Sequence, residues 1–132
     1  MGGEKAARRT VVIVDDDSSI RHVLTLLFRH ENFDVVGEAM NGQQAIALAR
    51  EYQPDFIILD YLMPTINGAS AANALRLLAP ASRIVAFSAA LEEQPDWADA
   101  FLNKDRIVEM TPLLESLCAE RVAPREPLRK TS

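Results

Sequence analysis

Several acidic side chains in this sequence directly follow apolar runs, where they could bind a metal or act as nucleophiles. Asp60 follows Phe56-Ile-Ile-Leu59, and three consecutive acids follow Thr10-Val-Val-Ile-Val14, namely Asp15, Asp16 and Asp17. The chain has one cysteine and two histidines that do not cluster with it, so a metal would be bound through oxygen atoms. These acids are therefore the first candidates for a functional site.

Carboxylates that gather at one place need a cation between them. Two carboxylates about 4 Å apart repel each other by roughly 4 kcal/mol at an effective dielectric constant near 20. Mg²⁺ suits such a site, because it accepts octahedral oxygen ligands and keeps several waters. The sequence therefore predicts a magnesium site, provided that the fold brings the acids together.

The apolar runs alternate with amphipathic segments. Continuous apolar runs are typical of strands that helices cover on both faces. Strands are predicted at residues 10–14, 33–39, 56–59, 82–87 and 100–103. Helices are predicted from Ser18 to near Glu31, from the N-cap Asn41 to before Pro54, over residues 69–78, and from the capping pair Thr111 and Pro112 onward.

This alternation predicts parallel strands joined by right-handed crossovers, and hence an α/β fold built as a three-layer sandwich. The carboxyl ends of parallel strands meet at one edge of the sheet, where ligands bind in open α/β folds. The polar residues that follow the first, third, fourth and fifth strands are the acids from Asp15, then Asp60, Ser88 and Lys104. We therefore expect these side chains to form one site.

Length and composition restrict the functional classes. A chain of 132 residues with 48% apolar residues can form one domain with a core. The net charge is −5 and basic residues concentrate near both ends, so the central part is acidic and direct nucleic-acid binding is not expected. No apolar run could cross a bilayer and no secretory signal begins the chain, which predicts a cytoplasmic protein without membrane insertion.

The order of these groups resembles the receiver domain of two-component response regulators over roughly Thr10 to Glu120. The matching pieces are Val14-Asp15-Asp16-Asp17-Ser18, Leu59-Asp60-Tyr61-Leu62-Met63-Pro64, Gly68, Ser88-Ala89 and Phe101-Leu102-Asn103-Lys104. The resemblance implies a flavodoxin-like, CheY-like fold with a five-stranded parallel sheet in the order 2-1-3-4-5. The receiver domain is expected at residues 10–121, after an N-terminal extension at residues 1–9, and the prolines and charges at the end predict a flexible basic tail at residues 122–132.

The resemblance makes Asp60 the phosphoaccepting aspartate. Asp15 and Asp16 match the acid pair of the family. Asp16 and Asp60 would ligate Mg²⁺ directly, Asp15 would act mainly through water, and the backbone carbonyl of Leu62 would be a further ligand. Mg²⁺ is thus the implied cofactor, and attack of a carboxylate on phosphorus would give an acyl phosphate.

Three further residues match catalytic and switch positions of the family. Ser88 matches the hydroxyl residue that bonds the phosphoryl group, Lys104 the lysine that pairs with it, and Phe101 the aromatic switch residue. A phosphoryl group adds a charge of roughly −1.5 to −2, which Ser88 can follow by hydrogen bonding. Movement of Ser88 would open space for Phe101 to turn inward, giving a two-state switch.

One segment departs from the family pattern. Only fifteen residues separate Ser88 from Lys104, and Pro95 is among them. A helical turn takes about 3.6 residues, so Leu91 to Trp97 can form little more than one or two turns. We expect a shortened, irregular or mobile fourth helix in the face through which relatives signal. Trp97 would either pack there or contact a partner.

Two apolar residues stand where relatives often carry polar groups that orient attacking water. Leu62 lies two residues beyond Asp60, and Ala90 lies two residues beyond Ser88. The sequence therefore predicts slow self-dephosphorylation, unless a partner supplies a polar side chain.

We interpret the chain as a stand-alone response regulator receiver rather than a conventional enzyme. It would accept a phosphoryl group on Asp60 from a sensor histidine kinase or a histidine phosphotransfer protein, and then switch its surface for an unknown output protein. Asp17 is interpreted as a helix cap rather than a metal ligand, and the whole acidic run could instead be only a solvated turn with an N-cap. One alternative function is an interaction module of degenerate receiver type that is never phosphorylated and whose shortened fourth helix is locked for one partner. A weaker alternative is a small Mg²⁺-dependent phosphatase, which would lack a general acid because Leu62 occupies the expected position.

Overall fold

A computed structural model describes residues 8–63 and 68–119 of the chain. Within these residues the strands form one parallel sheet in the order β2-β1-β3-β4-β5, as the resemblance implies. The strands are β1 (Arg9–Val14), β2 (Phe33–Ala39), β3 (Phe56–Leu59), β4 (Arg83–Phe87) and β5 (Ala100–Leu102). The helices are α1 (Ser18–Arg29), α2 (Gly42–Tyr52), α3 (Gly68–Leu78), the 3-10 helix η1 (Lys104–Glu109) and α4 (Met110–Ala119).

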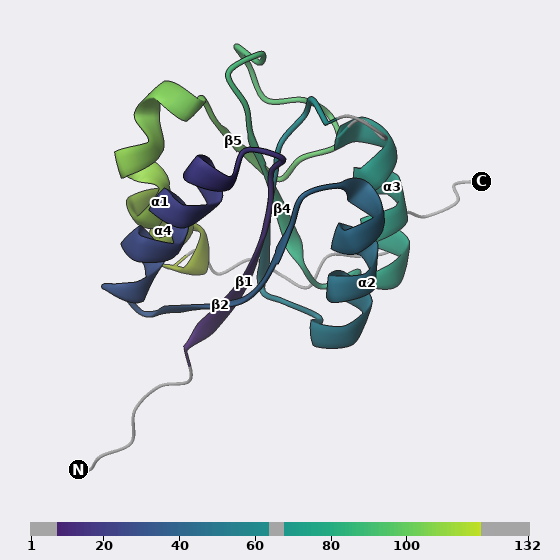
Figure 1. The fold of residues 1–132 in the computed structure, drawn as a ribbon, viewed down its shortest axis with the longest axis horizontal. Coiled ribbons are helices and arrows are strands. Elements are labelled where there is room, and N and C mark those ends of the chain that lie inside the picture. The colour runs from purple at the N-terminus through teal and green to yellow at the C-terminus, as the bar shows by residue number, and fades with distance from the viewer. Residues whose placement is uncertain (1–7, 64–67, 120–132) are drawn as a thin grey trace.

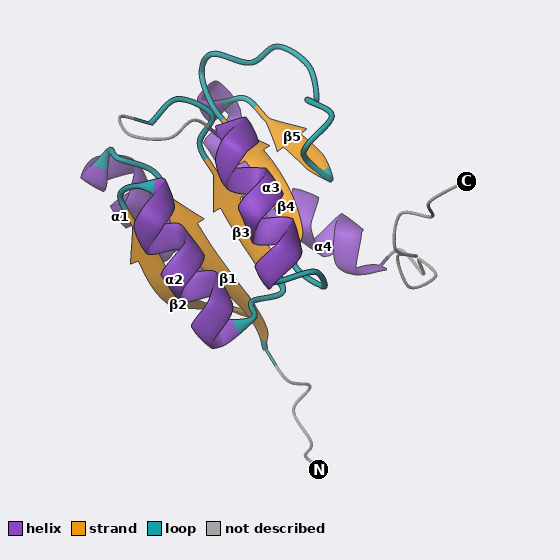
Figure 2. Ribbon diagram, turned by 90° about the vertical axis from the view of Figure 1, so that its right-hand side faces the viewer, coloured by secondary structure: helices purple, strands orange, loops and turns teal. Residues whose placement is uncertain are grey.

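The helices cover both faces of the sheet, which gives the three layers that the sequence predicts (Figure 1). α1 and α4 lie on one face, and α2 and α3 lie side by side on the other (Figures 1 and 2). β1 serves both layers through its alternating side chains, since Val11 and Ile13 pack toward α1 and α4 while Val12 and Val14 pack toward α2 and α3. Because both faces are buried, the strand sequence is continuously apolar rather than alternating.

Side-chain caps fix where the first two helices begin. The Asp17 carboxylate accepts a hydrogen bond from the Ser19 N–H at 2.9 Å, and the Asn41 side chain accepts one from the Gln44 N–H at 2.9 Å. Both residues thereby satisfy N–H groups that the first helical turn leaves without partners. Asn41 is the N-cap predicted from the sequence.

The start of the last helix differs from the prediction. Thr111 is not its cap, because α4 begins at Met110 and follows η1 directly. The Asn103 side chain caps this helical stretch instead, by accepting a hydrogen bond from the Asp105 N–H at 2.8 Å. Met110 is fully buried in the core beneath α4. Its packing extends the helix to a residue before Thr111, where the local capping signal predicted the helix to begin.

The connection from β4 to β5 contains no helix. Residues 88–99, all of them described, form turns and bends where a short or irregular helix is predicted. The connection rises beyond the carboxyl edge of the sheet as a loop in Figure 2. The predicted turn at Thr65–Gly68 falls mostly on residues 64–67, which lie outside the described residues, as does the predicted tail at residues 122–132.

Candidate functional site

Two acids lie next to each other because β1 and β3 are adjacent and parallel. Val14 pairs with Leu59 in the sheet register, so the next residues, Asp15 and Asp60, leave the sheet at the same level. The Asp60 N–H donates to the Val14 carbonyl at 3.0 Å and continues the ladder by one bond. Asp15 is 1% exposed and Asp60 is 4% exposed, so two carboxyl groups are buried beside one another.

Asp16 brings a third carboxylate to the same place. One carboxylate oxygen from each of Asp15, Asp16 and Asp60 lies within 4.8 Å of the others, and Asp16 is the exposed member. Asp17 has a different role, because its side chain caps α1. The acidic run is therefore divided between a carboxylate cluster and a helix cap.

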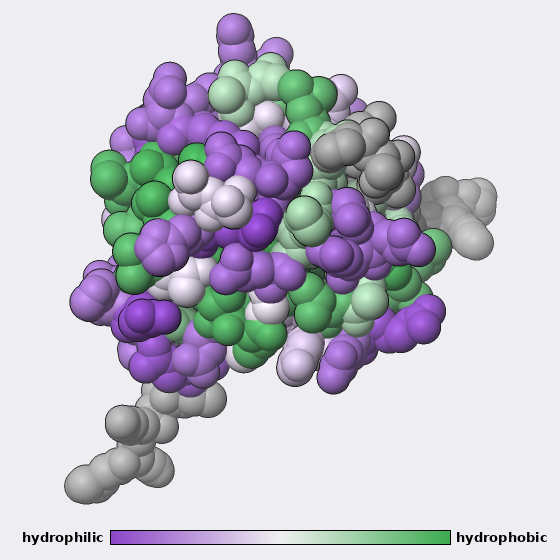
Figure 3. Space-filling view, in the orientation of Figure 1, coloured by the Kyte–Doolittle hydropathy of each residue, from purple (hydrophilic) through white to green (hydrophobic). Residues whose placement is uncertain are grey.

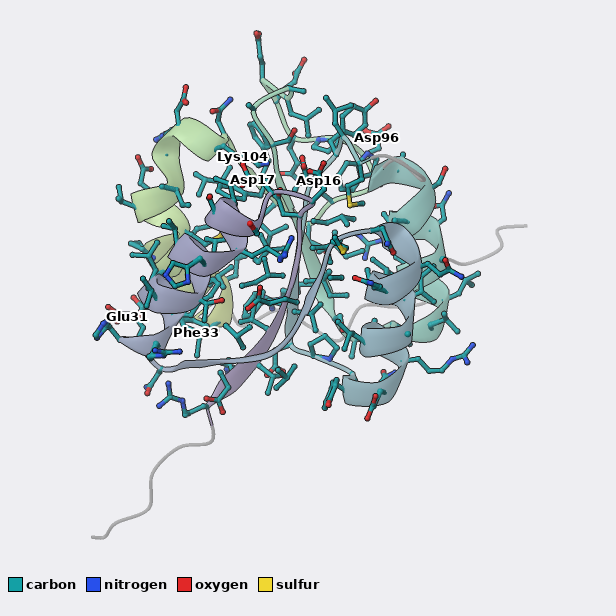
Figure 4. All side chains as sticks on the ribbon, viewed as in Figure 1. Asp16, Asp17, Glu31, Phe33, Asp96 and Lys104 are labelled. Atoms are coloured by element: carbon teal, nitrogen blue, oxygen red, sulfur yellow. The ribbon has the colours of Figure 1, made fainter. Side chains whose placement is uncertain are left out.

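Lys104 supplies a positive charge to the cluster. Its Nζ lies 2.7 Å from Asp15 Oδ2 and 3.3 Å from Asp60 Oδ2. Figure 4 shows Lys104 and Asp16 at the same end of the molecule, although they follow strands at different positions in the sheet. Glu31 and Phe33 mark the opposite end in this view. The carboxyl edge thus holds three acids and one lysine close together.

Burial and charge move two pKa values at this site. Burial raises the pKa of Asp60, the negative charge of Asp15 raises it further, and Lys104 lowers it only in part. Burial lowers the pKa of Lys104, but the hydrogen bonds and charges of Asp15 and Asp60 outweigh it, so the net shift is upward. The lysine therefore stays protonated, while ionised Asp60 is disfavoured without more positive charge.

The residues fit a bound Mg²⁺. Asp15 Oδ2 is buried and lies 2.7 Å from Lys104 Nζ in an ion pair. A buried carboxylate oxygen such as Asp15 Oδ2 suits a hard cation. The three carboxylates together supply the oxygen ligands that Mg²⁺ prefers. Asp15, Asp16 and Asp60 are the side chains that would hold the ion.

Ser88 and Phe101 lie on the two strands beyond β3. Ser88 follows β4, is 2% exposed, and its Oγ accepts a hydrogen bond from the Ala90 N–H at 3.2 Å. Phe101 is partly buried in β5 and lines a surface hollow of about 390 Å³ together with Pro112 and Leu113 of α4. Ser88 is therefore at the site edge, whereas Phe101 lies toward the outer surface.

Leu62 contributes its backbone rather than its side chain. The Leu62 N–H donates to Asp60 Oδ1 at 3.4 Å, and this bond opposes the rise in the Asp60 pKa. The residue is 56% exposed, so its apolar side chain lies toward solvent beside the acid.

Sequence reasoning missed an aromatic contact next to the site. The rings of Tyr61 and Trp97 are stacked, with centroids 6.1 Å apart and planes 9° from parallel. Arg76 of α3 also holds this region, because its guanidinium donates to the Trp97 carbonyl at 2.9 Å. The available signal was a lone tryptophan in the segment that departs from the family, but the sequence could not show its partner.

Comparison with protein families identifies the family to which the chain belongs. Residues 11–104 match the model of the response regulator receiver domain. The chain belongs to this family. The receiver of two-component signal transduction inferred from the motif order is thereby confirmed, and receivers are signalling modules rather than conventional enzymes.

Curated relatives of this receiver are longer regulators. The nitrate/nitrite response regulator protein NarL of Escherichia coli K12 is 37% identical over 115 residues, which cover 82% of this chain and 52% of NarL. The transcriptional regulatory protein PdtaR of Mycobacterium tuberculosis is 39% identical over 87 residues, covering 64% of this chain and 42% of PdtaR. The receiver thus spans about half the length of the curated relatives it matches.

Solved receiver structures have the same architecture. The response regulator domain of Thermotoga maritima CheB is 29% identical, with a TM-score of 0.76 over 89% of this chain and 99% of that one. The signal receiver domain of the putative response regulator NarL from Mycobacterium tuberculosis is 30% identical, with a TM-score of 0.72 over 87% and 100%. The likeness extends over nearly the whole receiver in both cases.

The helices of this receiver are too short or too polar to cross a bilayer. This holds for each helix within the described residues.

Proposed function

We propose that this receiver accepts a phosphoryl group on Asp60, in a Mg²⁺-dependent reaction, from the phosphohistidine of a sensor kinase or a phosphotransfer protein. The observation that carries the proposal is the buried Asp60 carboxylate, which shares its site with two other acids and contacts Lys104 at 3.3 Å. One lysine leaves three acids with excess negative charge, which a purely structural ion pair would not require.

The proposed transfer exchanges one bond for another. An oxygen of ionised Asp60 attacks phosphorus, a P–O bond forms, and the P–N bond to the donor histidine breaks. The imidazole leaves with the electron pair of that bond, and Asp60 becomes an acyl phosphate. Mg²⁺, when bound, supplies positive charge to the phosphoryl oxygens.

Two residues of the chain would stabilise the added group. Lys104 keeps its proton because its pKa is raised, and its ammonium can turn from the Asp60 carboxylate to a phosphoryl oxygen. The Ser88 hydroxyl accepts a hydrogen bond from the Ala90 N–H, so its own O–H can donate to a second phosphoryl oxygen. Both interactions would be stronger with the phosphorylated state than with the free acid.

We propose that phosphorylation then changes the surface that an output protein contacts. Ser88 begins the β4–β5 connection, and its movement toward the phosphoryl group would leave space for Phe101 to turn inward. The receiver would catalyse only its own phosphorylation and the loss of the group, and it would act in the cytoplasm without direct contact to nucleic acid.

Intact mass after incubation with acetyl phosphate and Mg²⁺ tests the acceptor. The wild type is expected to gain one phosphoryl group, and Asp60→Asn is expected to gain none. Asp17→Asn is the matched control, because asparagine also caps helices well, and it should gain the group as the wild type does. A wild type without any Asp60-dependent gain would contradict the proposal and favour a receiver that acts only as an interaction module.

A further inference from the structure

The Tyr61–Trp97 stack joins two segments that are distant in the sequence. Tyr61 directly follows Asp60, and Trp97 lies near the end of the β4–β5 connection. Their rings are nearly parallel, at 9°, with centroids 6.1 Å apart. Trp97 also packs against the core beneath α2 and α3. The residue after the acceptor therefore touches the segment in which this receiver departs from its family.

The start of α3 closes tightly around this stack. A Cβ atom added to Gly68 would lie 2.9 Å from Tyr61 Cα and 3.2 Å from Trp97 Cη2, closer than ordinary packing allows. The Gly68 N–H donates to the Tyr61 carbonyl at 2.8 Å. Gly68 therefore lies too close to Tyr61 and Trp97 for a side chain to fit between them, and we expect a shift of the Tyr61 backbone to displace Trp97 or the first turn of α3.

The other contacts of Trp97 hold its segment to the sheet and to α3. Arg76 donates to the Trp97 carbonyl at 2.9 Å and lies 3.3 Å from Asp99 Oδ2. Asp99 in turn accepts a hydrogen bond from the Ile84 N–H at 2.8 Å and donates its own N–H to the Ile84 carbonyl at 2.7 Å. These contacts tie the end of the connection to α3 and β4, although the connection contains no helix. A displacement of Trp97 can therefore be transmitted along it.

The connection begins at the edge of the sheet that carries the site. Ser88 is buried at its start, and Trp97 stacks on the neighbour of Asp60 near its end. We propose that the Tyr61–Trp97 stack couples the binding of a phosphoryl group at Asp60 to the conformation of residues 88–99. This proposal rests on the proposed phosphorylation of Asp60. The exposed side chains Glu92, Glu93 and Asp96 would then change position as part of the surface that a partner reads.

Trp97 makes the coupling measurable, because it is the only tryptophan of the chain. Its emission is recorded with Mg²⁺ alone and with Mg²⁺ plus beryllofluoride, which stands in for the phosphoryl group. Fluorine NMR on the same samples reports bound beryllofluoride independently, and amide exchange of residues 88–99 reports the segment itself. In the wild type we expect bound beryllofluoride, a changed Trp97 emission, and altered exchange in this segment.

Two variants at position 61 separate ring stacking from site occupancy. Tyr61→Leu should still bind beryllofluoride but lose most of the change in emission and exchange, whereas Tyr61→Phe should keep both because the ring remains. Tyr52→Leu is the matched control, since Tyr52 is the other tyrosine and lies exposed at the end of α2. It should behave as the wild type.

The outcomes distinguish the coupling from the function on which it rests. Bound beryllofluoride with unchanged emission and exchange in the wild type would overturn the coupling alone. So would a Tyr61→Leu variant that responds fully. If the wild type binds no beryllofluoride, the proposed phosphorylation fails, and the coupling fails with it.

Discussion

Asp60 is a buried acid next to a second buried acid, and this arrangement has a cost in the metal-free protein. Its pKa is raised by burial and by the charge of Asp15, so ionisation is easier in the unfolded chain than in the folded one. The cost is absent below the unfolded pKa of about 3.9 and develops as the pH rises through the folded pKa. The ionised Asp60 that the proposed reaction needs therefore lowers the free energy of unfolding.

Replacing this acid should stabilise the receiver. We expect Asp60→Asn, without divalent cations, to raise the free energy of unfolding at pH 7 by about 1–3 kcal/mol. The difference from wild type should shrink toward pH 4. Urea unfolding at both pH values measures this, with Asp34→Asn as the control because Asp34 is an exposed acid of β2. A destabilised Asp60→Asn at pH 7 would show that the ion pair with Lys104 outweighs the repulsion.

Lys104 has the opposite effect on stability. Burial lowers its pKa, but Asp15 and Asp60 raise it more, so its contribution is fully present below the unfolded pKa of about 10.4 and is lost as the pH rises through the folded pKa. Lys104→Met should lower the free energy of unfolding at pH 7 by about 1–3 kcal/mol. Arg50→Met, at an exposed position of α2, should have little effect in the same urea titration. Equal effects of the two variants would contradict the role of the ion pairs.

Leu62 tests the predicted slow loss of the phosphoryl group. Its side chain is 56% exposed beside Asp60, so a polar replacement can reach water without disturbing the core. We expect Leu62→Gln to shorten the phosphoryl half-life by about tenfold, since a polar group can orient the attacking water. Leu77→Gln on α3, where Leu77 is 82% exposed, is the matched control. A wild-type half-life of seconds in the isolated protein would contradict the prediction.

At the scale of elements, the β4–β5 connection is held by side-chain contacts instead of a helical hydrogen-bond ladder. Arg76 of α3 contacts both Trp97 and Asp99, and Asp99 bonds to β4 through Ile84. A single side chain on α3 therefore fixes the end of a segment that has no secondary structure of its own. Such segments open locally at lower free energy than the core of the sheet.

The Arg76 contacts should limit local opening of the β4–β5 connection. Arg76→Met should accelerate amide exchange in residues 88–99, and should lower the free energy of unfolding by about 1–2 kcal/mol because the partly buried Trp97 carbonyl and Asp99 carboxylate lose a donor. Amide exchange in β1 and β3 should accelerate only by the amount that the lower free energy of unfolding accounts for. If residues 88–99 exchange as slowly as in the wild type, other contacts hold the segment.

At the scale of the whole molecule, the hydrophobic cores and the candidate site occupy different parts of the sheet. Its two faces are covered by helices, and its carboxyl edge carries the acids, Ser88 and Lys104. Figure 3 shows apolar surface at the left, on the side where Figure 1 places α1. Val23 and Leu26 of α1 and Val108 of η1 are among the exposed apolar side chains. The site can therefore gain charge without disturbing either core.

Binding of Mg²⁺ should stabilise the entire fold through this edge. A ligand at about 100 times its dissociation constant adds about 2.7 kcal/mol to the free energy of unfolding. We expect Mg²⁺ to raise the thermal midpoint of the wild type, with reversal by a chelator and a much smaller effect in Asp15→Asn. Asp17→Asn and an equal ionic strength of sodium chloride are the controls. A rise that persists in Asp15→Asn would place the ion elsewhere.

The sequence by itself determined the sheet and the positions of its polar ends. The run before Asp60 and the run before Asp15 are continuously apolar because both sheet faces are buried, so pattern alone predicted the strands and the edge at which their acids meet. Asp17 and Asn41 were recognisable as helix caps because capping is a local interaction.

Only the tertiary structure decided what happens between β4 and β5. The absence of a helix at residues 88–99, the stack of Trp97 on Tyr61 and the hold of Arg76 depend on contacts between residues far apart in the chain. The start of α4 at Met110 rather than at a Thr111 cap has the same origin, since burial of Met110 outweighs the local signal. Local patterns predicted the strands and the caps of the first two helices, whereas long-range packing determines the start of α4 and the segment that we propose responds to Asp60.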